Sequence, residues 1–192
     1  MNASPCRGLT LIELMMTIAI AAILLAVAAP SFQQAINANR LGSAANELAS
    51  AINLARAEAV RQNRRAVLCR SADGSACDGT SSLWRGWIVF VDTDADGVRD
   101  AGEPVIKSGT FIEQLAVNSS ANIAGVNERI SFRADGTARG ADNVTLLTGT
   151  LAVCLATSLP AENVRDLSLA FGSRTAVRRR NGGAACGTPP DA

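Results

Sequence analysis

The hydrophobic pattern divides the chain into three stretches. From Leu9 to Ala29, 21 residues are almost all apolar. This is about enough helix to cross a bilayer roughly 30 Å thick. From Ile36 to Ala59, apolar residues recur mostly every fourth position, which predicts an amphipathic helix over residues 30–63. Pro30 lies between the two stretches and predicts a bend, because it removes one backbone donor and clashes with the preceding turn.

Residues 64–192 follow a different pattern, with short β-type runs separated by Gly, Asp, Asn and Ser. Close spacing without intervening helices predicts an α+β fold, in which a mostly antiparallel sheet packs on the long helix. We expect Trp87 to anchor that sheet against the helix, and segment 182–192 to be flexible apart from Cys186. The predicted strands are Ala66–Arg70, Gly86–Val91, Val105–Lys107, Arg129–Arg133, Thr150–Ala156, Asp166–Phe171 and Thr175–Arg179.

One acidic residue interrupts the apolar run. Glu13 is its fifth residue. A charge there costs on the order of 2.5–3.5 kcal/mol near the membrane centre and less toward an edge. A carboxylate kept in such a place needs a partner. The run contains no Lys or Arg, so the nearest positive charge is a free amino group at the start of the helix, if the chain is cut after Gly8.

The sequence Gly8-Leu9-Thr10-Leu11-Ile12-Glu13 resembles the processing site of type IV pilins and type II secretion pseudopilins. The resemblance implies that an inner-membrane prepilin peptidase removes residues 1–8 and methylates Leu9 as the new N-terminus. It also implies that Glu13 pairs with the terminal amine of a neighbouring subunit, and that Pro30 is the helix-softening proline of many pilins. The processed chain is then a single-pass inner-membrane protein with a periplasmic head, and later a filament subunit.

Two simpler interpretations of the same segment fit less well. A secretory signal peptide needs a small-residue cleavage site after its apolar region, whereas Pro30 follows here without an Ala-x-Ala pattern. A plain membrane anchor leaves Glu13 without a role.

Further along, residues 55–63, 67–69 and 86–92 look like the GspH/FimT branch of pilin-like proteins. This branch includes the FimT and FimU minor pilins and the H-type pseudopilin of type II secretion. Its fold is a long N-terminal helix followed by a β-sandwich-like head. The resemblance implies a minor pilin-like subunit whose partners are other pilins, and the alternative is the H-type pseudopilin. Two cysteine pairs and an arginine-rich end favour the pilus.

Composition argues against an enzyme. The chain has 192 residues, a formal charge of +1 and no histidine. Without histidine, a Ser-His-Asp or Cys-His nucleophile and a His-ligated zinc site are impossible. We therefore expect assembly and not catalysis, and a membrane-bound hydrolase is disfavoured.

Five cysteines are present, and cleavage after Gly8 removes Cys6. The remaining four allow three pairings. Proximity favours Cys69–Cys77 and Cys154–Cys186, in an oxidising space such as the periplasm. Buried free thiols and a four-thiol zinc site are the alternatives, although the spacings contain no Cys-x-x-Cys pair.

Residues 92–103 satisfy the spacing of an EF-hand calcium loop. Strand-like residues precede this loop, and Pro104 biases the residue before it toward an extended shape. The alternative is an acidic connection between two strands with Asp-Gly turn chemistry. The candidate calcium ligands are Asp92, Asp94, Asp96, Asp100 and Glu103.

Four arginines near the C-terminus form a local excess of positive charge. Such a cluster can neutralise DNA phosphates and predicts salt-sensitive DNA binding, as in DNA uptake. The alternative is a solvated strand end. Some FimT proteins bind DNA through a Gly-Arg-x-Arg motif, from which Gly172-Ser173-Arg174 departs. The candidate residues are Arg174, Arg178, Arg179 and Arg180.

Overall fold

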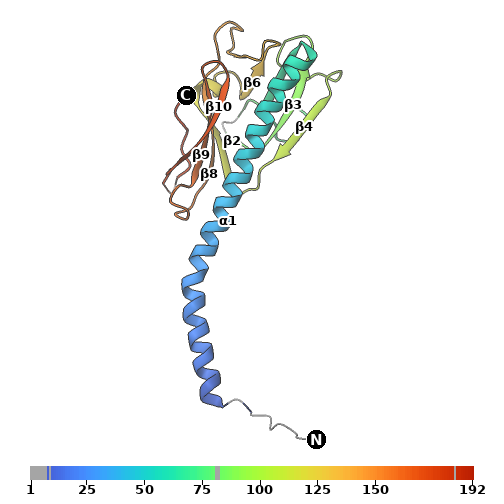
Figure 1. Ribbon diagram of the computed structural model, residues 1–192. Helices are drawn as coiled ribbons and strands as arrows, with labels where there is room; N and C mark the ends of the chain where they lie inside the picture. Colours follow the sequence, from blue (N-terminus) through green and yellow to red (C-terminus); the bar gives the residue numbers. More distant parts are fainter. Residues whose placement is uncertain (1–7, 9, 81–82, 184) are drawn as a thin grey trace, which may run out of the picture.

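The computed structural model describes residues 8, 10–80, 83–183 and 185–192. It consists of one long helix, whose first half projects as an exposed shaft and whose second half packs on a β-rich head (Figure 1). Helix α1 spans Leu11–Gln62 and has 52 residues. It continues through Pro30 without a break, and its exposed part is curved (Figure 1). The bend predicted at Pro30 itself stays a prediction. Asn63 ends the helix in a left-handed conformation with φ 50°.

The amphipathic second half of α1 is confirmed, but its buried face begins at Asn37 and not at Pro30. From there, buried positions recur every three or four residues and meet the head. Residues 10–36 extend beyond the head and are exposed.

The head consists of two five-stranded sheets in which every strand pair is antiparallel. One sheet has the order β4-β3-β1-β6-β7, and the other has the order β10-β9-β8-β5-β2. The predicted antiparallel arrangement is therefore confirmed, and a short helix α2 lies between β5 and β6 in sequence. The elements are β1 Arg65–Arg70, β2 Leu83–Trp84, β3 Gly86–Asp92, β4 Val105–Thr110, β5 Leu115–Ser119, α2 Ala121–Ala124, β6 Arg129–Phe132, β7 Ala138–Arg139, β8 Gly149–Leu155, β9 Val164–Ala170 and β10 Arg174–Arg180.

All seven predicted strands are present, with ends shifted by up to three residues. The sequence pattern missed β2, β5, β7 and α2. Three of these elements have only two to four residues, too short for a periodicity to be recognised. Strand β5 alternates buried and half-buried positions, as a strand with one covered face does.

The main core lies between α1 and both sheets. Helix α1 contacts β1, β3 and β6 of one sheet and β8 and β9 of the other. Leu48 of the helix and Trp87 of β3 are fully buried in the same cluster, so the predicted anchoring role of Trp87 is confirmed. Burying such side chains stabilises the head by roughly 1.5–3 kcal/mol each. The core therefore holds the second half of α1 firmly on the head.

Both predicted disulfides are present, Cys69–Cys77 and Cys154–Cys186. The first ties β1 to the loop after it, and the second ties β8 to the C-terminal segment. Cys6 lies outside the described residues. The segment expected to be flexible makes further contacts with the head: Asn118 Nδ2 donates to the Cys186 carbonyl at 3.1 Å, and the Asn122 backbone N–H donates to Asp191 Oδ1 at 3.0 Å.

Candidate functional site

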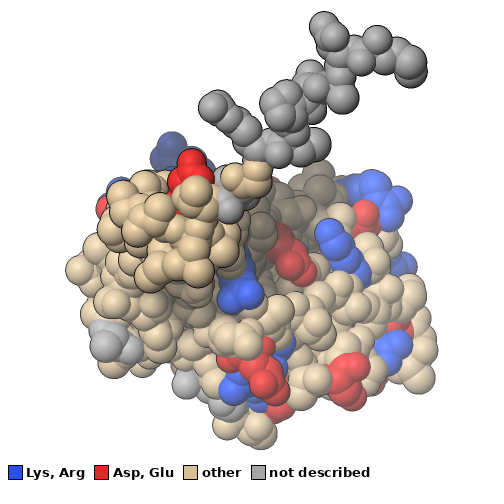
Figure 2. Space-filling model, turned by 90° about the horizontal axis from the view of Figure 1, so that it is seen from below, with Lys and Arg blue, Asp and Glu red and all other residues tan. Residues whose placement is uncertain are grey.

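The first half of α1 is the most unusual surface of the chain. Its large apolar side chains, from Leu11 to Val27, are 54–77% exposed, and Phe32 is 72% exposed. Its most apolar window has a mean hydropathy of 2.6 with no part buried, so the helix is long and apolar enough to cross a membrane. Figure 2 views the molecule from below and shows the projecting helix as mostly uncharged, with charged side chains spread over the head. A patch of this size requires lipid or other protein chains as a cover.

Glu13 is held at the start of the helix by a capping box. The Glu13 N–H donates to Thr10 Oγ1 at 3.3 Å, while the Thr10 N–H and hydroxyl donate to Glu13 Oε2 at 3.0 and 2.9 Å. These bonds satisfy free N–H groups of the first turn and place a negative charge at the positive end of the helix dipole. The carboxylate is therefore fixed beside the predicted cleavage point after Gly8. Leu9, the predicted methylated residue, lies outside the described residues.

Sequence reasoning missed this capping box, although the signal was present. A Thr followed three residues later by Glu, just before an apolar run, is the recognised pattern for a helix start. Glu13 thus has a partner within its own chain as well as the predicted one in a neighbouring subunit. Pairing with a neighbour's amine stays a prediction.

The predicted calcium loop joins β3 to β4, and its carboxylates separate into two sets. The side-chain oxygens of Asp92, Asp94 and Asp96 lie within 4.8 Å of one another. Glu103 instead accepts hydrogen bonds from Thr93 Oγ1 at 2.9 Å and from the Asp100 backbone N–H at 3.2 Å.

These contacts change the titration of the loop. Burial raises the pKa of Asp92 despite the backbone N–H groups of Ala95 and Gly97. Burial also acts to raise the pKa of Glu103, but the N–H groups of Thr93 and Asp100 outweigh it and lower that pKa. Glu103 is therefore a structural acceptor that closes the loop, and Asp100 is not part of the aspartate group. Calcium binding stays a prediction, with the three gathered aspartates as its ligands.

The structure separates the four C-terminal arginines. Alternate residues of a strand point to opposite faces. Arg178 accordingly lines a hollow on the outer face of the sheet, together with Asp166. Arg179 lines a different hollow, which lies between the sheet and α1. Arg180 forms a bidentate pair with Asp166, at 2.6 and 3.0 Å, which neutralises its charge and raises its pKa. Arg174 is exposed at the other end of β10. DNA binding stays a prediction: Arg174 and Arg178 are exposed on the outer face, and Arg179 is exposed on the side of α1.

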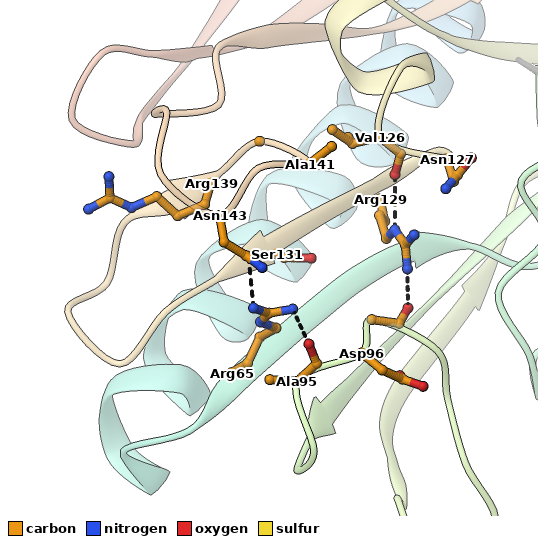
Figure 3. Close-up of a pocket in the computed structure, with 12 residues that line it drawn as sticks. Arg65, Ala95, Asp96, Val126, Asn127, Arg129, Ser131, Arg139, Ala141 and Asn143 are labelled. Carbon is orange, nitrogen blue, oxygen red and sulfur yellow. Dashed lines mark hydrogen bonds between the residues drawn. The ribbon is translucent and has the colours of Figure 1, made fainter.

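A small polar pocket of about 130 Å³ lies between the acidic loop and the strands beside it. Arg65 donates to the Ala95 carbonyl and to Asn143 Oδ1, both at 2.7 Å (Figure 3). Arg129 donates to the carbonyls of Gly97 and Val126 (Figure 3). The guanidinium groups are thus used to tie the loop to its neighbours. Sequence reasoning missed this pocket because its arginines are far apart in the chain.

A long N-terminal helix with an exposed apolar half, seated on antiparallel sheets, defines a pilin-like protein. The fold is similar to that of the type IV minor pilin FimU of Pseudomonas aeruginosa, with a TM-score of 0.54 and 23% identity over 77% of this chain and 96% of that chain. Residues 44–173 match the family model of the type II transport protein GspH, and residues 4–29 match the prokaryotic N-terminal methylation motif. The first match covers more than half of the chain, which therefore belongs to the GspH family.

Two other similar proteins are known by sequence or structure. The pilin-like protein PilA1 of Thermus thermophilus is 35% identical over 97 residues, which are 50% of this chain and 55% of PilA1. This chain therefore matches about half the length of that relative. The minor pseudopilin EpsH from the Type 2 Secretion System of Vibrio cholerae has a TM-score of 0.49 and 11% identity over 73% of this chain and 97% of that chain.

Proposed function

We propose that this protein is a minor pilin-like subunit of a type IV pilus or a pilus-like filament, which assembles through its N-terminal helix. The observation that carries the proposal is the exposed apolar half of α1, which no other part of the described chain covers. In the membrane lipid covers this surface, and in a filament the helices of neighbouring subunits cover it. The head then faces outward and supplies contacts with other subunits. The role is assembly, not catalysis.

Processing prepares the helix for assembly. A prepilin peptidase cuts after Gly8, and the new terminus at Leu9 is methylated, as the matched N-terminal methylation motif supports. The capping box holds the Glu13 carboxylate at the same end of the helix. An ammonium group of an adjacent subunit then neutralises Glu13, which removes the cost of a lone charge in an apolar environment. Before assembly the chain is a single-pass protein of the inner membrane with a periplasmic head.

The second candidate is the H-type pseudopilin of a type II secretion system. It is favoured by the matched family, whose description is type II transport protein. Both candidates use the same helix and the same acid, so the distinguishing measurement concerns partners. Copurification of the full chain with pilus subunits favours the first candidate, whereas copurification with secretion components favours the second. The third candidate, a DNA-binding subunit for uptake, requires that replacing Arg174 and Arg178 by Ala abolish a gel shift at low salt.

The test of the assembly proposal is the Glu13→Gln variant produced in cells. Gln keeps the shape but has no charge to offer an ammonium group, and hydrogen bonds to charged groups contribute about 1.5–3 kcal/mol. We therefore expect incorporation into filaments to fall more than about tenfold. Glu58→Gln is the matched control, because Glu58 lies on the same helix, in the half that packs on the head, and pairs with Arg61 of that helix at 2.6 Å. Normal incorporation of Glu13→Gln, or a cellular protein that still begins at Met1 by mass spectrometry, contradicts the proposal.

A further inference from the structure

A polar groove of about 330 Å³ runs between α1 and the β9–β10 hairpin, just above the point where the helix leaves the head. Residues of α1, including Gly42, Ser43 and Asn46, form one wall. Arg165 of β9 and Arg179 of β10 form the other. The groove therefore begins where the exposed half of the helix ends.

The two arginines are direct partners across the β9–β10 pair. Like charges opposite each other on adjacent strands destabilise a sheet. Arg165 is only 6% exposed, and its Nη1 donates to the carbonyls of Glu162 and Val164 at 2.8 and 3.0 Å. Burial lowers the pKa of Arg165, and the charge of Arg179 lowers it further, while Glu162 acts weakly in the opposite direction. Carbonyl groups orient this guanidinium without cancelling its charge.

Within the described part of the chain, neither arginine forms an ion pair, and the side chain of Arg179 forms no hydrogen bond. The contrast with Arg180 is informative, because that residue of the same strand is neutralised by Asp166. Arg179 is exposed, whereas Arg165 is buried, and a buried charge normally has a counter-ion. The groove thus contains two adjacent positive charges and no negative one.

Gly42 adds an independent observation about the opposite wall. A glycine inside a helix costs roughly 1 kcal/mol relative to alanine. Apart from the neighbouring backbone of α1 itself, no described atom lies within 4 Å of the place where a Cβ at position 42 would be, so packing against the head does not require the glycine. The missing side chain instead leaves room for an approaching backbone, as small residues do at helix–helix contacts.

We propose that this groove receives a neighbouring pilin-like subunit and that an Asp or Glu carboxylate of that subunit pairs with Arg165 and Arg179. This inference rests on the proposed function. The occupant is a protein because one wall of the groove is α1 itself, continuous with the apolar surface that neighbouring subunits cover in a filament. Two uncompensated guanidinium groups supply the charge complementarity, since carboxylates accept forked hydrogen bonds from arginine.

The experiment uses the full chain in cells, with a photo-crosslinking amino acid at position 46 in the groove or at position 32 on the exposed helix. We expect crosslinks to pilin-like subunits from both positions. Arg179→Glu should reduce the position-46 crosslink about tenfold or more, because it places a like charge against the partner's acid. Arg178→Glu is the matched control, because this exposed neighbour lies on the opposite face of the same strand. Far-UV circular dichroism of both purified variants in detergent checks that they fold.

Identification of the crosslinked peptide completes the test. We expect it to contain an Asp or Glu whose change to Lys restores the crosslink to the Arg179→Glu variant. Equal yields for the two arginine variants, a peptide without an acid, or a crosslink to nucleic acid would overturn the groove proposal while position 32 still crosslinks. Loss of subunit crosslinks from both positions in the unchanged chain would instead refute the assembly proposal itself.

Discussion

The two disulfides should differ in their contribution to stability, because they close loops of different length. In the chain-entropy account, a crosslink stabilises the folded state by restricting the unfolded chain. Cys69 and Cys77 are separated by 8 residues, and Cys154 and Cys186 by 32. The corresponding stabilisation at 25 °C is about 2.5 kcal/mol for the shorter loop and about 3.7 kcal/mol for the longer one. The expected difference is therefore about 1.2 kcal/mol.

The pair of variants Cys69→Ala/Cys77→Ala and Cys154→Ala/Cys186→Ala isolates this difference. Each variant removes two sulfur atoms, one from a buried position and one from a partly buried position. The loss of packing is thus similar, and loop length is the main variable. A soluble fragment beginning at Ser31 is suitable for the assay because every buried residue of α1 lies at or beyond Asn37.

Urea unfolding followed by tryptophan fluorescence is the measurement, since Trp84 and Trp87 are both fully buried. The free energy of unfolding should fall more in the Cys154→Ala/Cys186→Ala variant than in its counterpart. Reduction of the wild-type fragment should cost about as much as both variants combined. If the Cys69→Ala/Cys77→Ala variant is the less stable of the two, loop closure is not the source of the stabilisation.

Two further predictions concern the head. A Cβ at position 109 would lie 2.6 Å from the Trp87 ring. Gly109→Ala should therefore lower the free energy of unfolding, measured with urea, by about 1–3 kcal/mol. Gly102→Ala is the control, because the space around position 102 is open and this change should affect urea unfolding little. Hydrogen bonds from Thr80, with help from Arg70, lower the pKa of Asp78 to about 2. Its folded pKa is below the ordinary value of about 3.9, so its stabilisation is complete above pH 4 and is lost as pH falls toward 2. Asp78→Asn should therefore flatten the pH dependence of the urea midpoint between pH 4 and 2, and an unchanged slope would contradict this assignment.

Local sequence determined the parts of the fold that depend on neighbours along the chain. The apolar run and the four-residue spacing predicted α1, because helix formation and the burial of one face depend on residues three or four apart. Cys69 and Cys77 are close in sequence, so their pairing was predictable as well. The start of α1 was predictable too, since the Thr10–Glu13 capping box involves only one turn of helix.

Strand pairing decided what the sequence left open. Arg178 and Arg179 are adjacent in sequence, yet the pleat of β10 sends them to different hollows. The four arginines predicted as one cluster are therefore divided: Arg180 is neutralised, Arg174 and Arg178 lie on the outer face, and Arg179 is exposed on the groove side. The partnership of Arg179 with Arg165 depends on the register of β9 against β10, which no local pattern contains.

The order and spacing of residues along the chain thus determined the helix, most strands, the disulfides and the prepilin-like N-terminus. Tertiary structure alone decided that the strands divide into two sheets, that Glu103 closes its own loop, and that Arg165 and Arg179 share a groove beside α1. The physical reason is that helices and short loops are stabilised by contacts within a few residues. Charge compensation and sheet register depend instead on residues that meet only after the chain has folded.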